Sequence, residues 1–169
     1  ITSFTHHPFY DSFVLEIPDN YSNGAYYNLP VNELQAIVDH ALAQGYSVAW
    51  DGDVSEKGFS GKQGLAVLPR EPSRKDLFET PGKEKTVDQA SRQRMFESFS
   101  TTDDHLMQMV GTAKDKTGTE YFKIKNSWGE ISNYKGFLYM SRPYVEAKTV
   151  SIMVHKDAIP IEIMSKLAL

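Results

Sequence analysis

The clearest hydrophobic pattern in the chain lies in residues 31–44, where apolar positions recur at spacings of three and four. This spacing places the apolar side chains in one stripe along an amphipathic helix. The stripe consists of Leu34, Ile37, Val38, Ala41 and Leu42. Asn is a residue type that caps helix starts and Gly one that follows helix ends, so we predict a helix capped by Asn32 and ended by Gly45.

Two shorter helices are predicted further along the chain. Thr86 and Gln89 have the spacing of a capping box, which favours a helix over about Val87–Phe99. A last short helix is expected near Pro160–Leu167. Residues 51–85 are polar and interrupted by Gly and Pro. We therefore expect a long loop region there, of the kind that is usually functional or mobile.

The remaining apolar runs are short, bounded by turn residues and rich in β-branched and aromatic side chains, as strands are. They cover Ser12–Ile17, Tyr46–Trp50, His105–Ala113, Glu120–Ser127, Gly136–Met140 and Val150–Val154. Strands follow one another through short turns after residue 104, which favours antiparallel pairing. The predicted fold class is α+β, with an antiparallel sheet curled into a half-barrel and the 31–44 helix packed beside it.

Composition narrows the functional classes. The chain of 169 residues fits one domain, and its net charge of −4 argues against a surface that binds nucleic acid or anionic membrane over the whole domain. It contains no cysteine, so a disulfide or a thiolate metal site within the chain is excluded. No segment reaches membrane-spanning length. The chain begins with Ile1 rather than Met, and we expect it to be part of a longer protein whose targeting signals lie elsewhere.

One polar side chain is predicted on the buried face of a strand. Alternation along 121–128 puts Phe122, Ile124, Asn126 and Trp128 on one face and the lysines on the other. The apolar face should be the core, where an amide without hydrogen-bond partners would cost ~1–3 kcal/mol. Asn126 therefore needs a buried partner.

His105, on the preceding strand, is the candidate partner, but the hairpin register decides whether it can be. If Ala113 pairs with Glu120, then His105 lies opposite Trp128 and diagonal to Asn126 on the same face, within reach of two polar side chains. A register shifted by one residue, as from a loop closed by a bulge at Gly118, would put the two on opposite faces. The sequence leaves both registers open, and without further signals an ordinary strand-end His and turn Asn would be the default interpretation.

Short motifs in a fixed order change this balance. Asp104-His105 is followed by Gly111, then by Asn126-Ser127-Trp128-Gly129, then by the run 136–140, Gly-Phe-Leu-Tyr-Met. The His and the Asn are 21 residues apart. This ordered set resembles the papain-like cysteine peptidases, in which Cys, His and Asn form the catalytic triad. The four-residue Asn-Ser-Trp-Gly match alone would be weak, but the whole series across 104–140 is specific.

Other segments indicate a branch of that family. Residues 2–9 (Thr-Ser-Phe-Thr-His-His-Pro-Phe), 49–54 (Ala-Trp-Asp-Gly-Asp-Val) and 101–105 (Thr-Thr-Asp-Asp-His) resemble the bleomycin hydrolase, or aminopeptidase C, group. The insertion over 51–100 also fits that group better than the smaller papain pattern. The chain as a whole, 1–169, resembles the C-terminal, His/Asn-bearing part, with the N-terminal Cys-bearing part absent.

The resemblance implies roles for individual residues. His105 would be the general base that generates the thiolate and then the acid that protonates the leaving amine, while Asn126 would orient the imidazole. Trp128 would cover their hydrogen bond. Asp104 and Leu106 would support the site or bind substrate, and Leu106 is larger than the small residue that the family usually has there, which should reshape the pocket. No cofactor and no metal are expected.

The implied function is cysteine-type peptide hydrolysis, aminopeptidase-like, with this chain supplying the base and its orienting Asn. The alternative is a non-catalytic papain-like module for peptide binding or assembly. The implied partners are a peptide substrate, the Cys-bearing part of the same protein and further copies, since the group forms hexamers; membranes and nucleic acid are not expected. The resemblance implies a cytoplasmic location, but the sequence itself leaves the compartment open. The tail ending at Leu169 differs from the family's C-terminal arm, so exopeptidase and endopeptidase action both stay open.

Overall fold

A curled seven-stranded sheet forms the frame of the protein in the computed structural model, which describes residues 1–169. Its order is β4-β5-β8-β7-β6-β3-β9. The strands are β3 (Val48–Gly52), β4 (Phe59–Ser60), β5 (Leu65–Ala66), β6 (His105–Lys114), β7 (Glu120–Lys125), β8 (Phe137–Ser141) and β9 (Thr149–Met153). All neighbours are antiparallel except β5 and β8, which are parallel. The predicted α+β half-barrel is confirmed, with that one parallel pair as a departure.

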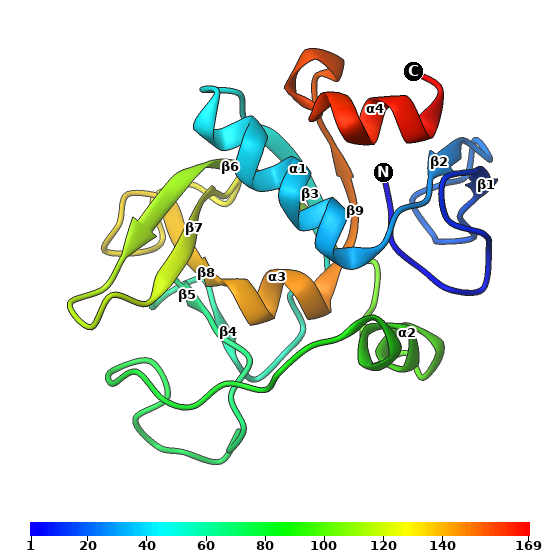
Figure 1. The fold of residues 1–169 in the computed structure, drawn as a ribbon. Helices are drawn as coiled ribbons and strands as arrows, with labels where there is room; N and C mark the ends of the chain where they lie inside the picture. Colours follow the sequence, from blue (N-terminus) through cyan, green and yellow to red (C-terminus); the bar gives the residue numbers. More distant parts are fainter.

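The helix α1 (Val31–Ala43) lies across the sheet against β3 and β6 (Figure 1). Its predicted stripe faces the core, where Ile37, Val38 and Ala41 are fully buried. The predicted cap at Asn32 is wrong, because the helix begins after Pro30 and no side chain of its own end caps it. The amide of Val31 instead donates to Gln89 Oε1 at 2.7 Å, a partner supplied from another helix. Gly45, with φ of +82°, follows the helix end as expected.

The helix α2 (Gln89–Glu97) is shorter than predicted, and its cap differs. Asp88 accepts from the Ser91 amide at 2.7 Å, and Ser91 Oγ accepts from the Asp88 amide at 2.9 Å. The capping box therefore lies two residues beyond the predicted Thr86/Gln89 pair. Gln89 is free to cap α1 because it does not cap its own helix.

Several elements were not predicted from the sequence. The strands β4 and β5 lie within the expected loop 51–85, and the helix α3 (Arg142–Lys148) joins β8 to β9. A separate hairpin near the N-terminus pairs β1 (Ser12–Val14), which lies within the predicted strand Ser12–Ile17, with β2 (Ala25–Tyr27), which was not predicted. A short 3-10 turn, η1 (Lys156–Ala158), precedes the expected last helix, α4 (Ile161–Leu167). None of the helices is long and apolar enough to cross a membrane.

The core lies between the sheet and α1. Its centre is Trp50 on β3, which is fully buried and donates its indole N–H to Thr149 Oγ1 at 2.7 Å. Met107 and Met109 on β6 and Ile124 on β7 belong to the same buried cluster. Because β3 and β6 are neighbouring strands, the start of β6 is attached to the strand that carries Trp50.

Candidate active site

The β6–β7 hairpin changes register along its length. At the turn, Lys114 pairs with Glu120 and Ala113 with Tyr121, which is the register that would put His105 and Asn126 on opposite faces. Further along, Met109 pairs with Ile124, and Val110 between the two regions has no partner. This β-bulge shifts the pairing by one residue and returns the site end to the register that places both side chains on one face.

His105 and Asn126 are in direct contact. His105 is the first residue of β6, and Asn126 follows the last residue of β7. Nε2 of His105 lies 2.9 Å from Oδ1 of Asn126. Asn126 is buried. Its backbone N–H donates to Gly136 O at 3.0 Å, which holds the residue against the start of β8. The hydrogen bond expected from the sequence is therefore present in the structure.

A second donor determines which imidazole nitrogen carries the proton. The backbone N–H of Ser127 donates to the same Asn126 Oδ1 at 2.7 Å. An N–H can only donate, so this atom is the amide oxygen, and His105 Nε2 must donate to it as well. In the neutral imidazole the proton is then on Nε2, and Nδ1 carries the lone pair. The site thus presents one defined proton acceptor, Nδ1 of His105.

One aromatic ring stacks on the imidazole, and a second packs against that ring. Trp128 stacks on His105 with ring centroids 4.6 Å apart and an interplanar angle of 23°. Phe59 of β4 meets the Trp128 indole edge-on at 6.1 Å. Trp128 is 44% exposed, so its ring covers the imidazole from the solvent side. The sequence pointed to Trp128 but not to Phe59, because the contact depends on how the 51–85 segment folds back.

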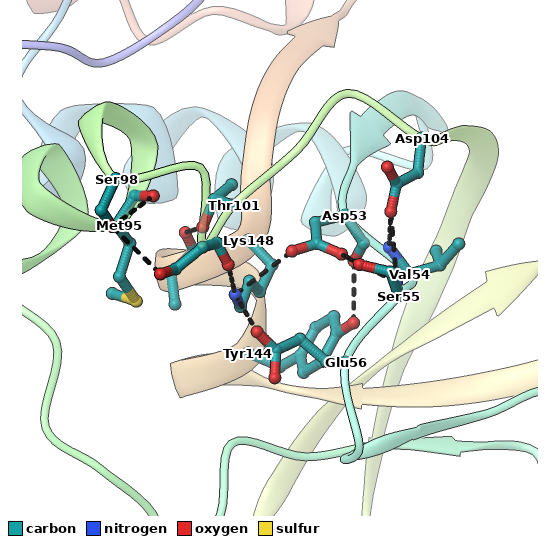
Figure 2. Close-up of polar contacts among 12 residues, drawn as sticks. Asp53, Val54, Ser55, Glu56, Met95, Ser98, Thr101, Asp104, Tyr144 and Lys148 are labelled. Atoms are coloured by element: carbon teal, nitrogen blue, oxygen red, sulfur yellow. Dashed lines mark hydrogen bonds and ion pairs between the residues drawn. The ribbon is translucent and has the colours of Figure 1, made fainter.

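The residues on either side of His105 face different surroundings. Asp104 Oδ2 accepts from the amides of Val54 at 3.1 Å and Ser55 at 3.2 Å (Figure 2). Partial burial acts to raise the pKa of Asp104, but hydrogen bonds from the side chain of Thr102, from the Val54 amide and from the side chain of Ser55 outweigh it and lower the pKa. Asp104 therefore remains a carboxylate that holds the loop after β3 beside the start of β6.

Leu106 points the other way and is 58% exposed. It lines a groove of about 980 Å³, to which Asn126 and Ser127 also contribute. The side chain of Leu106 thus forms part of the apolar wall of this groove. Elsewhere, no group of three or more His, Asp or Glu side chains has the geometry to hold a metal ion.

Comparisons with known proteins agree with the motifs. The family model for the Peptidase C1-like family matches residues 2–168. Aminopeptidase C of Lactobacillus helveticus is 27% identical over 157 residues, which are 90% of this chain and 33% of that protein. Bleomycin hydrolase of Rattus norvegicus is 28% identical over 145 residues, 84% of this chain and 30% of that protein. The chain thus spans about a third of the length of these relatives.

The fold also has a counterpart among solved structures. The crystal structure of PepW from Lactobacillus rhamnosis HN001 superposes with a TM-score of 0.70 at 20% identity, covering 98% of this chain and 36% of that one. The likeness supports the half-barrel architecture over the full length of the chain. The family model and the relatives together show that the chain belongs to the Peptidase C1-like family, in the branch of aminopeptidase C and bleomycin hydrolase.

Proposed function

We propose that this chain supplies the general base and its orienting amide to a cysteine peptidase with aminopeptidase-like action. The observation that carries the proposal is the His105–Asn126 hydrogen bond of 2.9 Å, with the Ser127 amide on the same oxygen. The thiol has to come from a Cys-bearing part of the same, longer protein, because none of the 169 residues is Cys. Relatives about three times as long as this chain leave room for such a part.

The defined protonation of the imidazole accounts for the proposed chemistry. Nδ1 of His105 accepts the thiol proton, which leaves a thiolate beside an imidazolium. The thiolate attacks the peptide carbonyl carbon, and as the C–N bond breaks the imidazolium returns its proton to the leaving amine. Nδ1 then accepts a proton from water, whose oxygen attacks the thioester and releases the acid and the thiol. Asn126 keeps Nδ1 directed outward throughout.

The neighbouring side chains have supporting roles in this proposal. Trp128 shields the His105–Asn126 hydrogen bond from water, which strengthens it by lowering the local dielectric constant. Asp104 anchors the strand start, and Leu106 forms part of the surface that contacts the substrate. The expected substrate is a peptide. Homo-oligomeric assembly stays a prediction, and sedimentation of the longer protein would test it by measuring the oligomeric state.

Hydrolysis assays on two proteins test the proposal. The chain alone should not cleave aminoacyl or N-blocked fluorogenic peptides, whereas the longer protein should cleave the aminoacyl substrates and lose this activity after thiol alkylation. Cleavage by the purified chain that resists the alkylator would rule out the cysteine-peptidase assignment. Cleavage of N-blocked peptides by the longer protein would retain the family chemistry and reject strict aminopeptidase action.

A chain without Cys that acted by itself would instead fit a second candidate, a non-catalytic module that binds peptides or takes part in assembly. The two candidates predict different behaviour of the longer protein. A module would bind peptides and remain inert towards them, with or without alkylation. Turnover that depends on a thiol would exclude it.

A further inference from the structure

A lysine is buried at the end of α3. Lys148, the last residue of α3, is 1% exposed, and its Nζ lies 3.2 Å from Asp53 Oδ2. The same ammonium group also contacts the carboxylate of Glu56 (Figure 2). Its third partner is the backbone carbonyl of Ser100. Because a buried charge is costly without partners, these three acceptors are what allows Lys148 to remain there.

The three acceptors belong to two segments that both lead to His105. Asp53 and Glu56 lie directly after β3, whose last residue, Gly52, pairs with His105. Ser100 lies in the segment between α2 and β6 that ends at His105. One ammonium group therefore joins the loop that follows the partner strand to the segment that precedes the imidazole.

Hydrogen bonds extend this contact to the residue next to His105. Asp53 Oδ1 accepts from the Ser55 amide at 2.7 Å and from the Ser55 hydroxyl at 2.8 Å. The Ser55 amide also lies 3.2 Å from Asp104 Oδ2. The path from Lys148 thus runs through Asp53 and Ser55 to Asp104, the residue that precedes His105, and Figure 2 shows the hydrogen bonds along it.

The backbone around Asp53 is held from the same side. The Asp53 amide donates to Lys148 O at 3.0 Å, and the Tyr144 hydroxyl donates to Asp53 O at 2.7 Å. Burial raises the pKa of Tyr144, and the negative charges of Asp53, Glu56 and Asp104 raise it further, so the hydroxyl stays a donor. A Cβ at Gly52 would collide with Lys148 O, which shows how closely α3 approaches the end of β3.

We infer that Lys148 is a positioning residue for His105, an inference that rests on the function proposed above. His105 is the first residue of β6, so the strand fixes the chain only on its C-terminal side. On its N-terminal side, the position of His105 depends on the 98–104 segment. Lys148 fixes that segment to the 53–56 loop and thereby fixes the imidazole relative to Asn126 and Trp128. A neutral side chain of similar length cannot make these three contacts.

A suitable control is a second buried cation outside this path. Arg92 on α2 is 1% exposed and donates to Ser3 O at 2.8 Å and to Glu146 O at 3.0 Å, but it contacts neither the 53–56 loop nor the 98–104 segment by a hydrogen bond. Lys148→Met and Arg92→Met each remove one buried positive charge. Both should lower the thermal midpoint, and only the first should disturb the imidazole.

The test has a readout that loss of stability alone would not move. Trp128 at 4.6 Å gives the ring protons of His105 a ring-current shift, which proton NMR measures on the chain itself. Lys148→Met should reduce this shift by half or more at a temperature where the variant is folded, and Arg92→Met should leave it unchanged. In the longer protein Lys148→Met should lower kcat by about tenfold with KM within about twofold, because misplacement of a catalytic group acts on the reaction step.

A second variant covers the case in which Lys148→Met does not fold. Combining it with Asp53→Asn removes the unpaired buried charge while keeping an acceptor for Ser55. This double variant should regain thermal stability and still show the reduced ring-current shift. A wild-type shift in the double variant, or an equal loss in Arg92→Met, would overturn the inference. If Lys148→Met reduces the shift but the wild-type longer protein has no thiol-dependent turnover, the positioning role stands and the proposed function fails.

Discussion

The two ends of the β6–β7 hairpin are built differently. At the turn end, Lys114 and Glu120 pair across the strands through an ion pair of 3.0 Å, with side chains 67% and 52% exposed. At the site end, Met109 and Ile124 pair with both side chains fully buried. An exposed ion pair contributes little to stability, whereas burial of two apolar side chains strongly favours one register. Burial therefore fixes which side chains face the core at the site end. At the turn end, where both side chains are exposed, burial does not select a register.

Val110 is the residue that lets the two ends differ. It is 42% exposed, has no partner on β7 and takes up the one-residue difference between the two registers. Since a slip of one residue turns every side chain to the other face, the hairpin without this bulge could satisfy its turn or its site but not both at the present strand lengths. The position of His105 beside Asn126 is thus a property of the strand interior, not of the turn.

The largest effect is expected at the site end itself, from His105→Ala in the longer protein. Loss of the base and acid should reduce thiol-dependent turnover by about 10⁴-fold or more. Steady-state hydrolysis of an aminoacyl substrate measures this loss, and the thermal midpoint should change little because His105 is partly exposed. Turnover within tenfold of the wild type would mean that His105 is not the base.

A pair of one-residue deletions in β6 tests the bulge directly. Deleting Gln108 moves His105 to the opposite face, so activity should fall by at least ~10³-fold. Deleting Val110 removes the unpaired residue and leaves the pairings at both ends possible, so activity should stay within about tenfold of the wild type. Both variants shorten the same strand by one residue, which makes each the control for the other. Equal losses would show that the register does not set the face of His105.

Asn126→Ala should lower activity less than His105→Ala does, and less than the Gln108 deletion that moves His105 to the opposite face. The imidazole keeps its basicity and loses the acceptor that selects its tautomer and orientation, so kcat should fall by about 10²-fold. Asn126→Asp is the matched comparison, because it keeps the oxygen that accepts from His105 and from Ser127. A kcat for Asn126→Asp as low as that for Asn126→Ala would contradict an orienting role for the oxygen.

Trp128→Ala should cost less again. The His105–Asn126 contact would remain but would be open to water, which weakens it, and kcat should fall by about tenfold. Trp128→Phe keeps a stacked ring and should recover most of that loss. The comparison requires only kcat for the two variants under saturating substrate.

At the turn end, Lys114→Ala and Glu120→Ala should have almost no effect. The ion pair is exposed and far from the imidazole, so the thermal midpoint should move by less than about 2 °C and turnover should not change. Thermal unfolding and the same hydrolysis assay measure both quantities. A clear loss of activity would show that the turn transmits its geometry past the bulge.

The local elements could be predicted where one face is apolar over several turns or residues. The α1 stripe and the strands β3, β6, β7, β8 and β9 have this signal, and all are present near their expected positions. Helix caps were predicted less well, since Gln89 caps α1 across the fold instead of its own helix. The helix α3 was not predicted, because its seven residues are too few to establish a helical period. In addition, Pro143 at its start is a residue type that usually interrupts helices.

Some residues of the candidate site could likewise be predicted from the sequence, and others could not. His105, Asn126 and Trp128 could be identified because they lie within short motifs in a fixed order. Phe59, the Ser127 amide and the Lys148 contacts could not, because each depends on segments that meet only in the folded chain. In the sequence, Lys148 in particular looks like an ordinary surface lysine, and only the structure shows that it is buried.

The sequence by itself determined the fold class, the apolar faces and the identity of the residues that could do chemistry, since periodicity and motifs are local properties of the chain. The tertiary structure alone decided the register at the site end, the proton position on His105 and the burial of Lys148. These depend on the free energy of burying side chains from both strands and from α3 together. The sequence of one strand cannot select the register, because both registers are compatible with its alternation of apolar and polar residues.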